Sequence, residues 1–269
     1  MNGVLIAVAS IKGAPGVTTM AVGLAAVWPR PGAVLVECDP AGGDLWARFG
    51  HHPNPGLSGL AAATLQRGNG QAFLAHQQRL AVGANVVLAV PGDGAAASVH
   101  TLAQRGIGLL RQAATAAPVL LDVGRLDPHS PSFALASAAD HVLLMARPDL
   151  AEQTQVGARL PWLVPNLSGQ LWLVPAGAGR LATGEIARDL GIPVIGNVPR
   201  SRWGAGVLCG QLHVPNWRRL GLGRAIAAIA AVLAAAGPAP MLALPPRRPM
   251  VVPVVRAPQH DPRPAQAPR

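Results

Sequence analysis

The chain has 269 residues, of which half are hydrophobic and 13% are charged, so it can bury the core of one large domain and is not disordered as a whole. Its formal net charge of +10 favours contact with polyanions such as nucleic acid or anionic lipid, although a compositional bias toward Arg, Ala, Gly and Pro would give the same excess. Two cysteines are too few for a disulfide framework, and no apolar run reaches the ~18 to 20 residues of a membrane span, so we expect a cytoplasmic protein without a transmembrane segment.

Short apolar runs alternate with segments of helical spacing along most of the chain. This alternation predicts an α/β fold with a mostly parallel, doubly wound sheet and helices on both faces. The expected strands are Val4–Ala9, Ala33–Glu37, Val86–Val90, Val119–Asp122, His141–Ala146, Leu171–Val174 and Val194–Asn197. The expected helices are Val17–Val27, Ala95–Ala116, Leu150–Leu163, Thr183–Leu190 and Trp217–Ala236.

The composition changes after Gly237. Residues 238–269 contain ten prolines, five arginines and one acidic residue. Proline lacks the backbone N–H that helices and sheets need, so this segment cannot hold either. We expect one folded domain over residues 1–237 and a disordered Pro- and Arg-rich tail over 238–269, which is either a solvated end or a basic docking arm.

The first expected strand leads into a glycine-rich turn, which is followed by two threonines at the start of a helix. Small residues let backbone N–H groups converge on phosphate oxygens, and the helix presents the positive end of its dipole to the anion. Thr18 has the hydroxyl that such a loop places on Mg²⁺. Of the 22 basic residues, Lys12 in this turn is the single lysine. For this segment alone, a glycine-rich turn without a ligand is the alternative.

The turn resembles the deviant Walker A loop of the ParA/MinD family of P-loop NTPases, K-G-G-x-G-K-S/T-T. The matching residues are Lys12, Gly13, Ala14, Pro15, Gly16, Val17, Thr18 and Thr19. The resemblance implies that Lys12 reaches across a nucleotide-sandwich dimer to the phosphates of the partner subunit. Ala14 is a mild departure from the family's glycine. Val17 replaces a lysine that contacts the β- and γ-phosphates, which removes a charge-assisted bond of roughly 1.5 to 3 kcal/mol.

Two acidic motifs follow in the order that the family has them. The segment VECDP contains Glu37 and Asp39 and is similar to the family's D-x-D-P, which implies that Asp39 orients the attacking water and contributes to the Mg²⁺ shell. A carboxylate at a strand's C-terminal end also lies on the ligand edge of an open α/β sheet, although an acid can simply open a Pro-Gly turn. Asp122 ends the next apolar strand, looks like a Walker B acid and would hold Mg²⁺ directly or through water. Gly124 stands where the family's γ-phosphate switch begins.

Two later features bear on the base and on a nucleic-acid partner. The segment 190–200 resembles the family's final core strand and the loop that packs on adenine, which puts Pro199 and Arg200 near the base. Pro175 stands where many members carry an Asn that reads the base, so adenine specificity comes from the resemblance alone. A group of arginines near Trp203 and Trp217 could grip a phosphate backbone without reading its sequence, or could be solvated helix faces. These arginines are Arg200, Arg202, Arg218, Arg219 and Arg224.

The resemblance covers residues 1–237 and implies an Mg·ATP-dependent homodimer, with Lys12 and Asp39 as catalytic residues in slow hydrolysis of ATP to ADP and phosphate. Its output would be the partitioning or positioning of DNA or of a cell-envelope or division machine, through an unidentified protein partner and in association with the nucleoid. The alternative is a degenerate, non-hydrolysing adaptor or regulatory protein with the same fold. Val17 and Pro175 favour the adaptor, whereas Lys12, Asp39 and Asp122 favour the ATPase.

Overall fold

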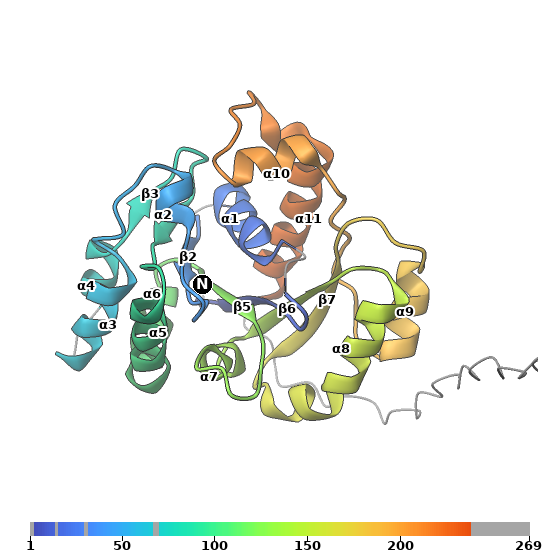
Figure 1. The fold of residues 1–269 in the computed structure, drawn as a ribbon, viewed down its shortest axis with the longest axis horizontal. Coiled ribbons are helices and arrows are strands. Elements are labelled where there is room, and N and C mark those ends of the chain that lie inside the picture. Colours follow the sequence, from blue (N-terminus) through green and yellow to red (C-terminus); the bar gives the residue numbers. More distant parts are fainter. Residues whose placement is uncertain (1–2, 14–15, 30–31, 67–69, 238–269) are drawn as a thin grey trace, which may run out of the picture.

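The computed structural model describes residues 3–13, 16–29, 32–66 and 70–237 of the chain. Ala14, Pro15 and the expected tail over 238–269 lie outside these residues. The described part forms a seven-stranded sheet in the order β3-β4-β2-β5-β1-β6-β7, in which only the β3–β4 pair is antiparallel (Figure 1). The α/β class and the mostly parallel sheet expected from the sequence are therefore confirmed.

The elements of the structure agree with the expected order of strands and helices and add several short helices to it. The strands are β1 (Leu5–Ser10), β2 (Val34–Glu37), β3 (Gln78–Arg79), β4 (Asn85–Val87), β5 (Val119–Arg125), β6 (His141–Ala146) and β7 (Gln170–Pro175). The helices are α1 (Val17–Val27), α2 (Leu45–Arg48), α3 (Leu57–Leu65), α4 (Gly70–Ala75), α5 (Asp93–Arg105), α6 (Ile107–Ala114), α7 (Ser132–Ser137), α8 (Leu150–Leu163), α9 (Thr183–Leu190), α10 (Arg202–Leu208) and α11 (Gly221–Ala236), with 3-10 turns η1 (Val164–Asn166) and η2 (Trp217–Arg219).

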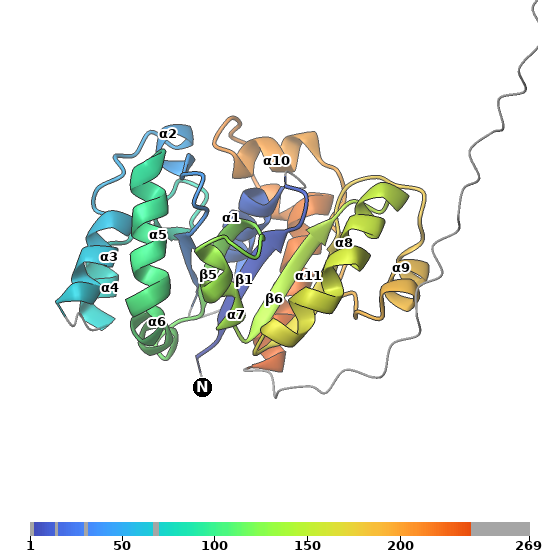
Figure 2. The same ribbon diagram turned by 60° about the horizontal axis from the view of Figure 1, so that its bottom comes forward.

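Each face of the sheet has its own apolar core, because side chains alternate along a strand. In β1, Leu5, Ala7 and Ala9 pack with residues of α3 and α5 to α9, whereas Ile6 and Val8 pack with residues of α1, α10 and α11. Figure 2 shows α7 and α8 in front of the sheet, with α1 and α11 behind it. Within the described residues, no helix is both long and apolar enough to cross a membrane.

The position of β1 determines where a ligand can bind. β1 lies between β5 and β6; the connection through α1 leads to β2 on one side, while β5 leads through α7 to β6 on the other side. In open α/β sheets, ligands bind beyond the carboxyl ends of the strands at the point where the direction of the connections reverses. The loop after β1 therefore lies at the expected binding edge.

The prediction of a last strand over Val194–Asn197 is wrong, because this segment does not form a regular strand. The segment forms two isolated parallel bridges to β7, at Leu173↔Val194 and Ala176↔Val198. Three steps along β7 correspond to four steps along this segment, so one extra residue interrupts the ladder between the two bridges.

The long helix expected over Ala95–Ala116 is two helices. α5 ends at Arg105 and α6 begins at Ile107, with Gly106 between them. A Cβ atom on Gly106 would overlap the side chain of Leu102, so the close approach at this junction requires glycine. The last helix likewise begins later than expected, after the separate turn η2.

Candidate functional site

The loop between β1 and α1 has the backbone that a phosphate site needs. Gly13 and Gly16 adopt φ values of 83° and 92°, in the left-handed region that favours glycine. α1 begins at Val17 with no side-chain cap hydrogen bond and no acidic residue in its first turn. The N–H groups of that turn and the positive end of the helix dipole are thus directed at the loop, which is an arrangement suited to an anion.

The side chains of the loop point in different directions. Lys12 is exposed, and no hydrogen bond or ion pair joins it to another described residue. Val17 is only 6% exposed and belongs to the apolar cluster between the sheet and α1. Thr19 is turned toward α10, where its hydroxyl lies 3.5 Å from Sγ of Cys209. The one cation of the loop is therefore exposed, and Val17, which stands where the resemblance expects the loop lysine, is part of the core.

Asp122 lies in β5 beside the start of α1. It is 2% exposed, and its carboxylate accepts hydrogen bonds from the Thr18 side chain and, at 3.2 Å, from the Gly124 N–H. Burial raises the pKa of Asp122 to about 6, and these two hydrogen bonds oppose the rise. The pairing of β1 with β5 shifts by one residue here, since Val8 pairs with Asp122 and Ala9 with Gly124. Such bulges commonly redirect side chains next to functional sites.

Asp39 follows β2 and is brought against the same turn of β5. Its carboxylate accepts a 2.9 Å hydrogen bond from the Ala41 N–H, and burial raises its pKa. Gly124 has φ 61°, and a Cβ atom at this position would overlap the Asp39 carboxylate. The second and third acidic motifs of the sequence therefore meet at the backbone of Gly124, next to the start of α1.

Glu37 holds together the segments around Asp39, a role that the sequence did not indicate. It is 3% exposed; Oε1 accepts a 3.3 Å hydrogen bond from the Leu45 N–H, and Oε2 accepts a 2.9 Å bond from the Ala89 N–H. Burial raises the pKa of Glu37 to about 7, which those two hydrogen bonds oppose. The carboxylate joins the end of β2 to the beginning of α2 and to the chain after β4. This contact with distant backbone explains why local patterns could not identify the role.

The residues beside α1 fit a magnesium ion shared with a phosphate. Among the described residues, no three His, Cys, Asp or Glu side chains are grouped as a metal site. Mg²⁺ rarely needs such a group, because it usually keeps waters and binds one or two carboxylates together with substrate phosphates. The hydroxyl of Thr18, the carboxylate of Asp122 bonded to it and the nearby Asp39 are oxygen ligands of that kind.

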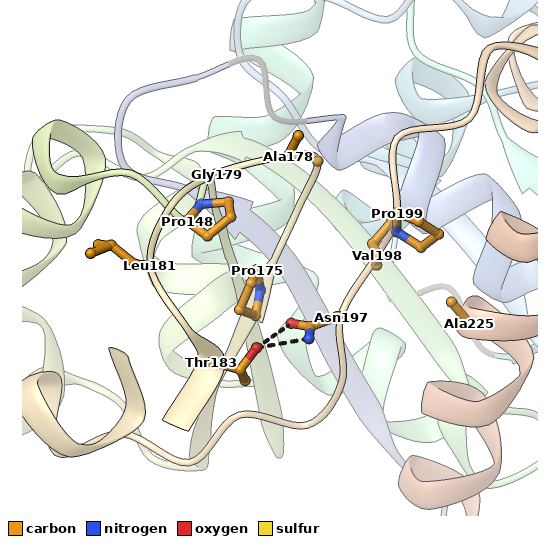
Figure 3. A pocket seen from close by; sticks show the side chains of 11 residues that line it. Pro148, Pro175, Ala178, Gly179, Leu181, Thr183, Asn197, Val198, Pro199 and Ala225 are labelled. Carbon is orange, nitrogen blue, oxygen red and sulfur yellow. Dashed lines mark hydrogen bonds between the residues drawn. The ribbon is translucent and has the colours of Figure 1, made fainter. Parts of the chain in front are cut away.

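A separate pocket of about 530 Å³ lies beyond the ends of β6 and β7 (Figure 3). It includes Pro199, the residue expected near a base, and Pro175, which replaces the family's Asn. Arg200 was expected there too; it is exposed and is not among the described residues that line the pocket. The lining residues are Pro148, Pro175, Gly177, Ala178, Gly179, Leu181, Thr183, Asn197, Val198, Pro199 and Ala225.

One member of the expected basic group, Arg218, is exposed but makes hydrogen bonds to the backbone of two other segments. The Arg218 guanidinium donates to the Ala26 and Val82 carbonyls at 3.1 and 3.2 Å, and it lies 5.3 Å from the ring of the buried Trp217. It thus joins the end of α1 to the turn before β4. The other side chains, including the 61% exposed Trp203, are at the surface. The exposed arginines are Arg200, Arg202, Arg218, Arg219 and Arg224, and of these Arg218 is the one bonded to the backbone of distant segments.

No protein-family model and no curated protein sequence matches the chain. Among solved structures, it is similar to a ParA family ATPase from Chlorobium tepidum (17% identity, TM-score 0.66, 85% of this chain and 98% of that one). It is also similar to the cell division ATPase MinD from Pyrococcus furiosus (18%, 0.65, 85% and 97%). A third similar structure is MinD from Pyrococcus horikoshii complexed with Mg-ADP (16%, 0.62, 84% and 93%). At these identities the comparison shows the fold, which is the P-loop fold of the ParA and MinD ATPases.

We expect Gly124→Ala to destabilise the protein by about 2 kcal/mol or more, because a left-handed φ alone costs roughly 1 to 2 kcal/mol and the methyl group would also displace Asp39. Urea denaturation measures the change. The control is Gly108→Ala in α6, where a Cβ atom meets nothing within 4 Å and should stabilise slightly. Equal stabilities of the two variants would show that Gly124 and Asp39 are not in contact.

Proposed function

We propose that this chain, which has the fold of the ParA and MinD ATPases, is an ATP-binding dimerisation switch. The observation that supports this function best is the meeting of three segments at the start of α1. Thr18 is bonded to Asp122, and the turn at Gly124 touches Asp39, although these residues come from separate parts of the sequence. A fold that had kept only its scaffold would have no physical need to place two desolvated carboxylates beside an uncapped helix start.

Each group in this site has a proposed role. The N–H groups of the loop and of the first turn of α1 would bind the phosphates. Thr18 and Asp122 would hold Mg²⁺, with Asp39 nearby; when bound, the ion would neutralise charge on the phosphates. The carboxylate of Asp39 would orient the attacking water, so that ATP is hydrolysed slowly to ADP and phosphate.

Lys12 is proposed to act on the nucleotide of a second copy. Its side chain is exposed and forms no hydrogen bond or ion pair with the described part of its own chain, so it is available to a partner subunit. An ammonium group on a flexible stem is a compact point charge, whereas a guanidinium is a planar fork. The chain uses arginine for its 21 other basic residues, which supports a specific need for lysine at this position.

Val17 supports a second candidate, a non-hydrolysing adaptor. Because this side chain packs in the core, the loop offers no cation in cis to the β- and γ-phosphates. In that case the fold would be retained for a partner surface, and dimerisation would not depend on ATP. The oxygen ligands beside α1 and the exposed lysine make the switch the better-supported function.

The proposed output of the switch is the partitioning or positioning of DNA, or of a cell-envelope or division machine, through a protein partner. For DNA, support comes from the exposed side chains of Arg200, Arg202, Arg219 and Arg224. Arginines at a surface bind phosphates without reading bases, which would place the protein on the nucleoid.

Lys12→Ala should abolish ATP-dependent dimerisation, because the phosphates would lose their contact from the partner subunit. Light scattering with and without Mg·ATP measures dimer formation, and a phosphate-release assay measures turnover.

Asp39→Ala should bind Mg·ATP but lose turnover by about 100-fold or more, as expected for a positioned base. Asp189→Ala, at an exposed residue of α9, is the matched control. A wild-type protein that forms the same amount of dimer with and without Mg·ATP would support the adaptor instead.

Val17→Lys should tighten Mg·ATP binding by roughly 10- to 150-fold, the equivalent of a charge-assisted hydrogen bond of about 1.5 to 3 kcal/mol. Val17→Met is the control, since it has a similar reach without the charge. Titration calorimetry measures affinity, and circular dichroism checks that both variants are folded. A folded Val17→Lys protein with unchanged affinity would place the phosphates away from this loop.

DNA binding should require ATP and should weaken steeply as salt rises, because bound arginines release counterions. Arg200→Ala and Arg202→Ala should each reduce the slope of log affinity against log salt by about 1. Arg218→Ala should leave that slope unchanged and instead lower the free energy of unfolding by about 1 to 2 kcal/mol. Fluorescence anisotropy with a DNA duplex and urea denaturation test both outcomes. Salt-insensitive binding, or a slope altered by Arg218→Ala, would contradict this assignment.

A further inference from the structure

A free arginine lies at the end of β5, on the ligand edge of the sheet. Arg125 is the last residue of β5; it is exposed, and no hydrogen bond or ion pair joins it to another described residue. It comes directly after Gly124, whose backbone touches Asp39, and three residues after Asp122. A positive charge therefore follows the turn at which the two acids of the candidate site meet, and it is paired with neither of them.

The shifted pairing of β5 with β1 decides which face of the sheet Arg125 is on. Val8 pairs with Asp122 and Ser10 pairs with Arg125, so two steps along β1 correspond to three steps along β5. Side chains alternate along a regular strand, which would put residues 122 and 125 on opposite faces. The extra residue brings Arg125 to the face of Asp122 instead, and this is the face that α1 covers.

Ser10 links this position to the phosphate loop. Its hydroxyl accepts a 3.2 Å hydrogen bond from the Gly13 N–H, and its carbonyl accepts a 2.8 Å bond from the Leu126 N–H. Ser10 is only 1% exposed, so the loop and the end of β5 are held together by buried bonds. Paired strands lie about 4.8 Å apart, which is less than the reach of an extended arginine side chain. The Arg125 guanidinium can therefore reach a phosphate that is bound in the loop.

A second arginine near the start of α1 is already paired. Arg48 forms an ion pair with Asp44, and its Nη1 lies 3.4 Å from Sγ of Cys209. That sulfur lies 3.5 Å from Oγ1 of Thr19, in the first turn of α1. Arg48 is thus held beside the helix by a carboxylate, whereas Arg125 has no such partner among the described residues.

We propose that Arg125 supplies within its own subunit the positive charge that Val17 does not, by binding the terminal phosphate of the nucleotide in the loop; this inference rests on the proposed function. Asp39 is proposed to orient the water that attacks the terminal phosphate, and Arg125 comes directly after the turn that Asp39 touches. A guanidinium binds a phosphate through two parallel N–H groups. The contact distinguishes ATP from ADP, because ADP lacks the terminal phosphate.

The test uses titration calorimetry on the full chain with the Mg²⁺ complexes of ADP and of adenylyl imidodiphosphate, an ATP analogue that is not hydrolysed. Arg125→Ala should weaken binding of the analogue by roughly 10- to 150-fold, as for the loss of a hydrogen bond between charged groups, and binding of ADP by less than about threefold. Arg125→Lys should recover part of the loss, since it keeps the charge but not the fork. The loss should persist in the Lys12→Ala protein, because the contact is made within one subunit.

Arg105→Ala, at an exposed residue that ends α5, is the matched control and should change neither affinity. An Arg125→Ala protein with wild-type affinity for the analogue would overturn the inference and leave the phosphate site intact. Equal losses for ADP and the analogue would also overturn it. A wild type that binds neither nucleotide would overturn the proposed function together with this inference.

A second comparison tests the replacement of the loop lysine directly. In a Val17→Lys protein that circular dichroism shows to be folded, the new ammonium group takes over the phosphate contact. Arg125→Ala should then weaken analogue binding by less than about threefold, because the two cations serve the same phosphate and their effects are not additive. An equal loss in both backgrounds would show that Arg125 does not stand in for the lysine. If Val17→Lys does not fold, the comparison of Arg125→Ala with Arg105→Ala decides alone.

Discussion

The contact of β5 with the start of α1 is the constraint on which the site depends. Asp122 is buried, and a buried carboxylate is costly unless hydrogen bonds satisfy it. The partners of Asp122 are the Thr18 side chain and the Gly124 N–H. Those bonds fix the turn at Gly124, and that turn leaves room for Asp39 only because glycine has no side chain. One buried acid thus sets the positions of the helix start, the turn and the second acid.

A second buried acid supports this arrangement from the neighbouring strand. Glu37 binds the backbone of Leu45 and Ala89, so the chain that carries Asp39 is held at both ends. As a result, the carboxyl groups of Glu37 and Asp122 are both buried and lie close to each other, and the pKa of each is raised. Structural acids of this kind are common at ligand sites, because the charge that destabilises the empty site stabilises a bound cation.

The sequence predicted the strands β1, β2 and β4 to β7, the glycine-rich turn and both aspartates, because these features are local: apolar runs, turn residues and an acid at a strand end. It did not predict β3, whose two polar residues form no apolar run. It missed contacts between distant segments. The roles of Glu37 and Arg218 depend on backbone groups dozens of residues away. The place of Arg125 beside Ser10 depends on a shifted register between β1 and β5 that no periodicity shows. Short helices such as α2 and α10 were missed as well, since four to seven residues hold too little of a helical period.

The central claim is that the turn after β1 holds a triphosphate against α1, with magnesium on oxygen ligands from the helix start and from β5. The most direct measurement is a crystal structure of the protein grown with millimolar Mg²⁺ and a non-hydrolysable ATP analogue. The account predicts phosphate density at the backbone of residues 12–19 and a magnesium ion beside Thr18 and Asp122. A well-ordered turn with neither phosphate nor metal under those conditions would contradict it, and the chain would then share the fold without its nucleotide chemistry.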